Sequence, residues 1–259
     1  METDKIKEIA LPAIKFDTTF IEPTDVELRE VSSFFHFFLP LNRTKEMYER
    51  LKQDEELILA IIKNTSISLN LLKTLEGIYS SVSLLRRYEG IRKARAVAKL
   101  INEELKKDVK KKFAVFCVHA DVMHAIRLGV LPIYRTQTCF NNIDPADRRK
   151  KIRKFHAYQS YKVFISNIMA AGNGIELSNA DEVLFVELDW YFYRNVQALL
   201  RVHNMRRKNP VRVRFIALND SNTDSKIIYI FKRYIKRAVE SDTGVIMLDP
   251  KHDTQAKPQ

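Results

Sequence analysis

Two groups of residues in the second half of the chain have the types and spacing that phosphate chemistry needs. The first is the loop AAGNGIEL, in which Gly172 and Gly174 follow a short apolar run. Glycine lets the backbone approach a ligand closely, so that its amides can donate to phosphate or sugar oxygens. The third glycine of a dinucleotide-binding fingerprint is missing, and two glycines also form an ordinary turn. The loop predicts either a phosphate contact or a turn.

The second group lies in the segment RNVQALLRVHNM, residues 194–205. Helical spacing puts Gln197, Arg201 and Asn204 on one face. The apolar stripe of the same helix contains Val196, Leu199 and Leu200. A glutamine and an arginine one turn apart can reach one ligand together, with the arginine as a clamp on a transferring phosphate. An exposed polar face accounts for the same spacing equally well.

Other signatures of catalysis are missing from the sequence. It contains no G-x-x-x-x-G-K-[ST] phosphate loop and no strand that ends in an Asp-Glu pair to hold magnesium. It also has no CxxC or HExxH pattern, so a metal site is poorly supported. Cys117 and Cys139 fall in or beside expected strands, which favours buried thiols in a reducing compartment over a disulfide.

Composition indicates a globular protein with an anionic partner. The chain has 259 residues, of which 46% are hydrophobic, and a formal net charge of +12. Such an excess of Lys and Arg favours a polyanion, because neutralising phosphates releases condensed counterions. A solvated basic surface is the alternative. We expect an intracellular protein, since no apolar run approaches the roughly 18 residues of a membrane span and no secretory signal opens the chain.

Short apolar runs that alternate with helical segments predict a mostly parallel sheet. The expected strands are KFAVFCVHA, VLPIYRTQT, 163–165, 183–187 and 211–217, with an earlier strand-like segment in LPAIKFDTTFIEP. Polar residues stand where several of these strands end, and ligands bind at the carboxyl ends of strands in open α/β sheets. The pattern therefore predicts a sheet of the RecA-like type with its site at that edge.

Apolar periodicity and capping residues predict the helices. Asp144 with Pro145 at the first position marks the start of DPADRRKKIRKFH, whose Ile152 and Phe155 should face the core. The cations Arg148, Arg149, Lys151 and Lys154 of that helix should face outward. Further helices are expected from about residue 24 and at 46–62, 67–85, 91–105, 120–129, 194–203 and 224–239, with a break at Gly90.

These elements suggest three parts. Residues 1–88 should form a helical subdomain and connection, 89–240 the α/β lobe, and 241–259 a polar tail. The basic run KKDVKKK before the first lobe strand reads as a solvated linker or as a phosphate contact.

Several blocks of this sequence resemble the second RecA-like lobe of the Swi/Snf branch of superfamily-two helicases. They are KFAVFCVHADVMHAI, DPADRRKKIRKF, SNIMAAGNGIELSNADEVLFVELDW and QALLRVHNMRRKNPVRVRFIAL, followed by NTDSKI. The blocks occur in the order of motifs IV, V and VI and cover about residues 88–240. The similarity is greatest to the annealing-helicase-like subgroup. The opening LPAIKFDTTFIEPTDVELREV is similar to the segment that follows motif III in these enzymes.

The resemblance implies roles for individual positions. Gln197 and Arg201 would be the catalytic Gln and first Arg of motif VI, facing ATP and magnesium held mainly by a first lobe. Nucleotide-binding residues would be Gly172, Gly174, Glu176 and Arg206. Nucleic-acid-binding residues would be His119, Arg148, Arg149, Ser166, Asn167 and Ile168. For His119, a buried histidine with satisfied hydrogen bonds is the alternative.

The sequence departs from the family at three places. Asn204 stands where motif VI has its second arginine, and losing such an arginine costs roughly three to five orders of magnitude in rate. Arg206 or Arg207 could substitute. Tyr191-Phe192 replaces the usual Asn-Pro, and Phe140-Asn141 replaces Asp-Gly. These changes bear on ATP hydrolysis more than on fold or DNA binding.

The resemblance implies the second motor lobe of an ATP-dependent DNA translocase or helicase. Its partners would be DNA, expected to be double-stranded, and a first lobe in the same or another polypeptide. The chain should hydrolyse ATP only together with that first lobe and should be located with DNA, not at a membrane. The alternative is a non-catalytic module, derived from such a lobe, that binds nucleic acid or protein. A Rossmann-type enzyme is disfavoured because its glycine fingerprint is missing.

Overall fold

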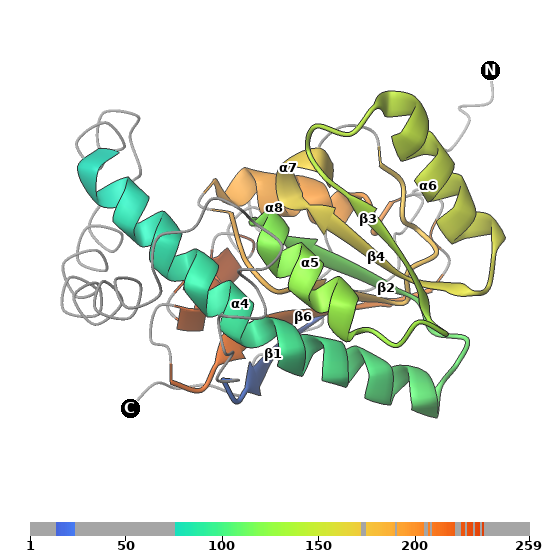
Figure 1. Cartoon of the computed structure of the whole chain (residues 1–259), viewed down its shortest axis with the longest axis horizontal. Coiled ribbons are helices and arrows are strands. Elements are labelled where there is room, and N and C mark those ends of the chain that lie inside the picture. The colour runs from blue at the N-terminus through green and yellow to red at the C-terminus, as the bar shows by residue number, and fades with distance from the viewer. Residues whose placement is uncertain are drawn as a thin grey trace, which may run out of the picture.

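The chain forms one parallel sheet with helices on both faces (Figure 1). The computed structural model describes residues 14–23, 76–171, 175–189, 191–204, 207, 209–220 and, in part, 224–235. The strands are β1 (Ile14–Ile21), β2 (Phe113–Cys117), β3 (Arg135–Cys139), β4 (Tyr161–Asn167), β5 (Glu182–Phe185) and β6 (Val211–Leu218), in the order β1-β6-β5-β2-β4-β3. Every neighbouring pair is parallel, so the predicted α/β fold is confirmed.

The helices divide between the two faces. They are α4 (Glu76–Lys107), α5 (Ala120–Gly129), α6 (Pro145–Ala157), α7 (Ile168–Ala171) and α8 (Phe192–Leu200). Core residues of α4 and α5 form one apolar cluster with the sheet. Residues of α6, α7, α8 and the helical segment around Phe231 form the other. Strand β2 serves both clusters, because Ala114 and Phe116 point to one face and their neighbours to the other.

Strand β1 belongs to the same sheet as the lobe. It pairs along its whole length with β6, from Ile14 opposite Val211 to Ile21 opposite Leu218. The strand predicted near the start of the chain is therefore confirmed. Its backbone hydrogen bonds are made with β6, a strand of the lobe. The helices expected from about residue 24 and at 46–62, the residues 67–75 of the next one and the tail at 241–259 lie outside the described residues. The rest of the helix expected at 67–85 is helical, as the start of α4. The division at residue 88 stays a prediction.

Helix α4 corrects one prediction, because it runs from Glu76 to Lys107 without a break at Gly90. The glycine is fully inside the helix, and tertiary contacts explain its presence there, as described below. The end of α5 approaches α4 equally closely, since a Cβ on Gly129 would lie 2.6 Å from Cβ of Ala98. Asn102 on α4 joins the two helices by donating to the carbonyl of Gly129, at 2.9 Å.

Two further elements differ in extent from the expectation. Residues 130–134 are a turn, in which the amide of Tyr134 donates to the carbonyl of Leu131, so β3 starts only at Arg135. Helix α8 ends at Leu200 instead of His203. The start of α6 is as predicted: the carboxylate of Asp144 accepts from the amides of Ala146 and Asp147, at 2.8 and 3.1 Å.

Candidate functional site

The residues that follow β2, β4 and β5 lie next to one another, because these three strands are adjacent and parallel. We call residues 118–119, 167–168 and 186–189 the carboxyl edge. It contains three of the residues that were predicted to bind nucleic acid. They are His119 after β2, Asn167 at the end of β4 and Ile168 directly after it. The sheet topology thus brings together positions that are about 50 residues apart in the chain.

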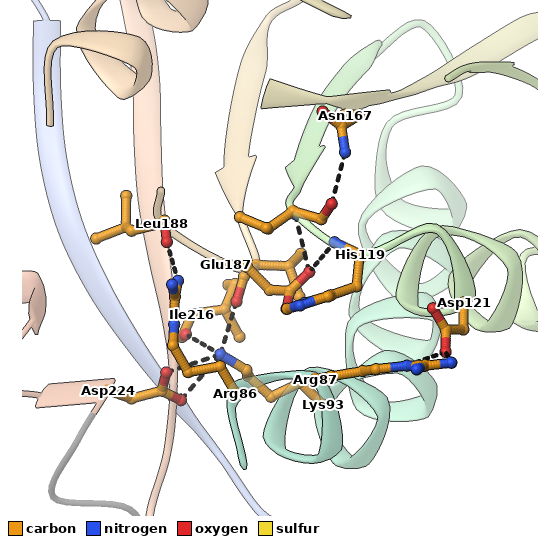
Figure 2. A network of polar contacts seen from close by, with 12 residues as sticks. Arg86, Arg87, Lys93, His119, Asp121, Asn167, Glu187, Leu188, Ile216 and Asp224 are labelled. Atoms are coloured by element: carbon orange, nitrogen blue, oxygen red, sulfur yellow. Dashed lines mark hydrogen bonds and ion pairs between the residues drawn. The ribbon is translucent and has the colours of Figure 1, made fainter. Parts of the chain in front are cut away.

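Glu187 is at the centre of this edge (Figure 2). Its Oε2 accepts hydrogen bonds from the amides of Val118 and His119, both at 2.9 Å, and its Oε1 accepts from Nδ1 of His119 at 2.6 Å. Glu187 is only 4% exposed. Burial raises its pKa, but the hydrogen bonds and charge of His119, together with the charge of Arg86, outweigh this and hold the pKa below its usual value. The carboxylate is therefore ionised.

Asn167 joins β4 to the same place. Its side-chain amide donates to the carbonyl of Val118 at 2.5 Å, and its Oδ1 accepts from the amide of Met169 at the start of α7. Its neighbours Ser166 and Ile168 are 0% and 1% exposed, so both have packing roles here. Of these three predicted nucleic-acid residues, Asn167 is the one whose side chain is partly exposed.

Two cations of α4 donate hydrogen bonds to backbone carbonyls of the carboxyl edge. Arg86 donates to the carbonyl of Leu188. Nζ of Lys93 is buried, donates to the carbonyl of Val186 at 2.6 Å and lies 2.9 Å from the carboxylate of Asp224. Figure 2 shows these side chains reaching from α4 toward the strand ends. The carboxyl edge is therefore tied to α4 by charge-assisted bonds as well as by apolar packing.

The candidate nucleotide side lies between the loop after α7 and helix α8. The amide of Leu177 donates to the carbonyl of Arg201 at 2.8 Å, which fixes the end of the glycine loop against the end of α8. Glu176 is half-buried and accepts from the hydroxyl of Ser178. Its carbonyl accepts from Nε2 of His156 at 2.8 Å. Gly172 and Gly174 lie outside the described residues.

Gln197 and Arg201 stand one turn apart at the end of α8. Gln197 is exposed and Arg201 is half-buried, with helical backbone angles at the C-cap position. Asn204 lies beyond the helix and its side-chain amide donates to the carbonyl of Arg201 at 3.3 Å. The expected helical face of three residues is thus wrong for Asn204, because the helix ends before it.

Arg207 has a structural role in this structure. Its guanidinium donates to the carbonyls of Ser178, Ala180, Asn209 and Pro210, at 2.6 to 3.1 Å. Arg207 is 6% exposed, and burial lowers its pKa, while the charge of Asp181 opposes this. Arg206 and Arg207 were the two candidates to replace the second arginine of motif VI. The guanidinium of Arg207 is bound to these four carbonyls. Arg206 lies outside the described residues.

The basic helix α6 places Arg149 in solvent and Arg148 half-buried. The guanidinium of Arg148 donates to the carbonyl of Asn141 at 3.4 Å. One of the cations expected to face outward bends back, since Nζ of Lys151 donates to the carbonyl of Thr138 on β3 at 2.7 Å. Phe155 is buried and Ile152 packs against the core, as expected.

Two functional candidates were not among the sequence-predicted residues. Glu187 could have been noted as an acidic residue directly after a buried strand. His203 is fully buried, and no described residue hydrogen-bonds to either of its ring nitrogens. Burial, and to a smaller extent the charge of Arg207, lowers the pKa of His203. Nothing in the sequence distinguishes it from an exposed histidine.

The cysteines are free and buried, as predicted. Burial raises the pKa of both thiols, and raises that of Cys117 well above its usual value. Within the described ranges, no three His, Cys, Asp or Glu side chains are grouped to hold a metal ion. No helix in the described part of the chain is both long and apolar enough to cross a membrane.

The chain is similar to known proteins in sequence and in fold. Residues 92–206 match the family model of the helicase conserved C-terminal domain. The Swi/Snf ATPase C-terminal domain of Sulfolobus solfataricus is 18% identical with a TM-score of 0.52, over 88% of this chain and 89% of that one. The core of that ATPase in complex with double-stranded DNA has a TM-score of 0.58 at 17% identity, over 92% of this chain and 51% of that one.

The fold is that of a carboxy-terminal RecA-like lobe of Swi/Snf ATPases. Among curated proteins, the regulator of chromatin subfamily A-like protein 1 of Drosophila melanogaster is 30% identical over 84% of this chain. The TATA-binding protein-associated factor of Saccharomyces cerevisiae is 29% identical over 52% of this chain. The chain spans 30% and 8% of the lengths of these relatives. Together these similarities show the fold of such a lobe, and a sequence similarity to the helicase conserved C-terminal domain over residues 92–206.

Proposed function

We propose that the chain is the second motor lobe of an ATP-dependent DNA translocase or helicase. In this role Gln197 and Arg201 face ATP and magnesium that a first lobe binds, while the carboxyl edge contacts one DNA strand. The hydrogen bond between the amide of Leu177 and the carbonyl of Arg201 carries the proposal, because it holds Leu177, the residue after Gly174-Ile175-Glu176 in the sequence, against the Gln197–Arg201 end of α8. A nucleotide bound there could contact both this segment and the end of α8.

DNA is the proposed polyanion. The net charge of +12 supports a phosphate-rich partner, and the Sulfolobus solfataricus ATPase of the same fold is described in complex with double-stranded DNA. The names of the curated relatives refer to chromatin and to the TATA-binding protein, which supports a location with DNA. The annealing-helicase-like subgroup is part of the proposal, and the sequence blocks that resemble that subgroup support it.

The experiment that tests the motor role supplies a first lobe. The purified chain is mixed with a phosphate-loop lobe from a Swi/Snf ATPase, and DNA-stimulated ATP hydrolysis is measured against each protein alone. We expect no hydrolysis by the chain alone, because its sequence has no phosphate loop. Hydrolysis by the mixture that falls by about a hundredfold in Arg201→Ala supports the proposal. Hydrolysis by the chain alone would overturn it.

A non-catalytic binding module is the second candidate, and Asn204 favours it. The expected arginine is absent there, and Arg207 is bound to four carbonyls. Asn204→Arg should raise hydrolysis by the mixture at least about tenfold if only the finger is lacking. Asn209→Arg, at an exposed position nearby, controls for added charge. DNA binding without hydrolysis in both the wild type and Asn204→Arg would favour the module.

A further inference from the structure

One buried carboxylate and one side-chain amide together join the ends of three neighbouring strands. Glu187, after β5, accepts from the amides of Val118 and His119, after β2. The peptide carbonyl of Val118 accepts in turn from the side chain of Asn167, at the end of β4. The turn after β2 is therefore held from both sides, by an acceptor on one neighbouring strand and a donor on the other (Figure 2).

The imidazole of His119 is held by the same carboxylate. Nδ1 donates to Oε1 of Glu187 at 2.6 Å, which is a short, charge-assisted contact. A carboxylate bonded to one ring nitrogen fixes both the ring orientation and the site of the proton. The His119 side chain is 16% exposed, whereas that of Glu187 is 2% exposed. The partly exposed imidazole is thus oriented by the buried carboxylate.

The surroundings of Glu187 are built to keep it in place. Helix α4 passes so close that a Cβ on Gly90 would lie 2.8 Å from Oε1. Burying a carboxylate is unfavourable unless its lone pairs are satisfied, and here they are satisfied largely by backbone amides of a turn. A purely structural tie between β2 and β5 would not need an ionised group at this edge, because apolar packing already joins these strands.

We propose that Glu187 is a positioning residue for nucleic-acid binding. Its carboxylate fixes the Val118–His119 turn from one side, and Asn167, which donates to the carbonyl of Val118, fixes it from the other. The turn so held presents the imidazole of His119 to the DNA backbone. This inference rests on the proposed function, in which the carboxyl edge contacts DNA. Glu187 does not touch the nucleic acid itself. It acts through the backbone and the imidazole of the turn.

Glu187→Gln is the decisive variant, because it keeps the shape of the side chain. One carboxylate oxygen, an acceptor, is replaced by an NH₂ group, a donor. That donor would face either the amides of Val118 and His119 or Nδ1 of His119, so the hydrogen bonds made by the replaced oxygen are lost. The matched control is Glu182→Gln, at the other end of β5. Glu182 is equally buried and forms ion pairs with Arg214 and Lys111, the latter at 2.6 Å. Both variants remove one buried negative charge, the control at the start of β5 and Glu187→Gln just after its end.

Affinity for a short fluorescent DNA duplex is measured by anisotropy at one fixed salt concentration, alongside stability in urea. Glu187→Gln should weaken binding about tenfold, and His119→Ala should do the same. The affinity of the double variant should lie within about twofold of that of each single variant, because both substitutions act on the same turn. Glu182→Gln should lose stability but bind within about twofold of wild type. Hydrogen exchange at the amides of Val118 and His119 should speed up only in Glu187→Gln.

The outcomes separate this inference from the function on which it rests. If the wild-type chain binds and Glu187→Gln binds equally well, the inference is wrong and the nucleic-acid role stands. Independent, multiplying losses in the double variant, or an equal loss in Glu182→Gln, would also overturn it. If the wild-type chain binds no DNA at all, the nucleic-acid role fails and the positioning role fails with it.

Discussion

Gly90 of α4 lies directly against the carboxylate of Glu187. A Cβ at this position would lie 2.7 Å from Cγ2 of Val122, 2.8 Å from Oε1 of Glu187 and 3.0 Å from its Cδ. The glycine is therefore required by close approach of three elements, not by a break in the helix. Its position links α4 to the proposed nucleic-acid edge.

Gly90→Ala should destabilise the protein although alanine is the better helix former. The gain in helix propensity is about 1 kcal/mol, whereas displacing a buried valine and a hydrogen-bonded carboxylate costs about 2 to 3 kcal/mol. We expect a net loss of about 1 to 2 kcal/mol in the free energy of unfolding, measured in urea. The difference in stability between Arg95→Ala and Arg95→Gly, at an exposed position of α4, calibrates the helix propensity alone. A Gly90→Ala protein more stable than wild type would contradict the packing described here.

Arg207 should prove structural and not catalytic. Arg207→Met removes the donors to four carbonyls and should lower the free energy of unfolding by about 2 to 4 kcal/mol. Arg207→Lys keeps the charge but cannot reach four acceptors, so it should recover only part of the loss. Arg194→Met, whose side chain is 28% exposed, should lose about 1 kcal/mol or less. Full stability of Arg207→Met would show that the guanidinium is available for another role.

His203 should make stability fall in mild acid. Its pKa is lowered in the folded state by burial and by Arg207, so the unfolded chain takes up the proton first as pH falls. Its contribution is present above the unfolded pKa of about 6.5 and is lost as pH falls below that value. His203→Leu should therefore show a shallower decline in urea stability between about pH 7 and 5 than wild type. Equal slopes for the two proteins would exclude this role.

The outer face of α6 should contribute to the salt dependence of DNA binding. The helix has six Lys or Arg residues and one Asp, and Arg149, Lys150 and Arg153 are exposed on one face. No described residue forms an ion pair or hydrogen bond with these three side chains. Like charges one turn apart repel, so this face is destabilising without a partner.

Changing all three to Gln should reduce the slope of log affinity against log salt by about 1 to 3, since each neutralised phosphate contributes about 0.9. Stability should stay the same or rise slightly. The matched control changes Lys99, Lys106 and Lys107, three exposed cations of α4, to Gln. If both triple variants reduce the slope equally, the effect comes from net charge alone and not from α6.

Much of the fold was predictable because it depends on local pattern. Continuous apolar runs are typical of strands buried on both faces, and β2, β4, β5 and β6 are such strands. The Asp144-Pro145 pair predicted the start of α6 because capping is decided within one turn of helix. The break predicted at Gly90 was wrong, because this glycine allows close packing inside α4 and does not end a helix. The start predicted for β3 was also wrong, because Pro132 lies in a turn in which the amide of Tyr134 donates to the carbonyl of Leu131, and the strand begins at Arg135.

The sequence by itself determined the parallel sheet, the edge at which polar residues gather and the lack of a phosphate loop. Only the tertiary structure decided which of those polar residues act together. Glu187 and His119 are 68 residues apart, and Leu177 meets the carbonyl of Arg201 across a loop and a helix. Such pairs depend on strand order and on the close approach of α4, which are set by packing of the whole core. Residue type and spacing carry no information about contacts at that separation.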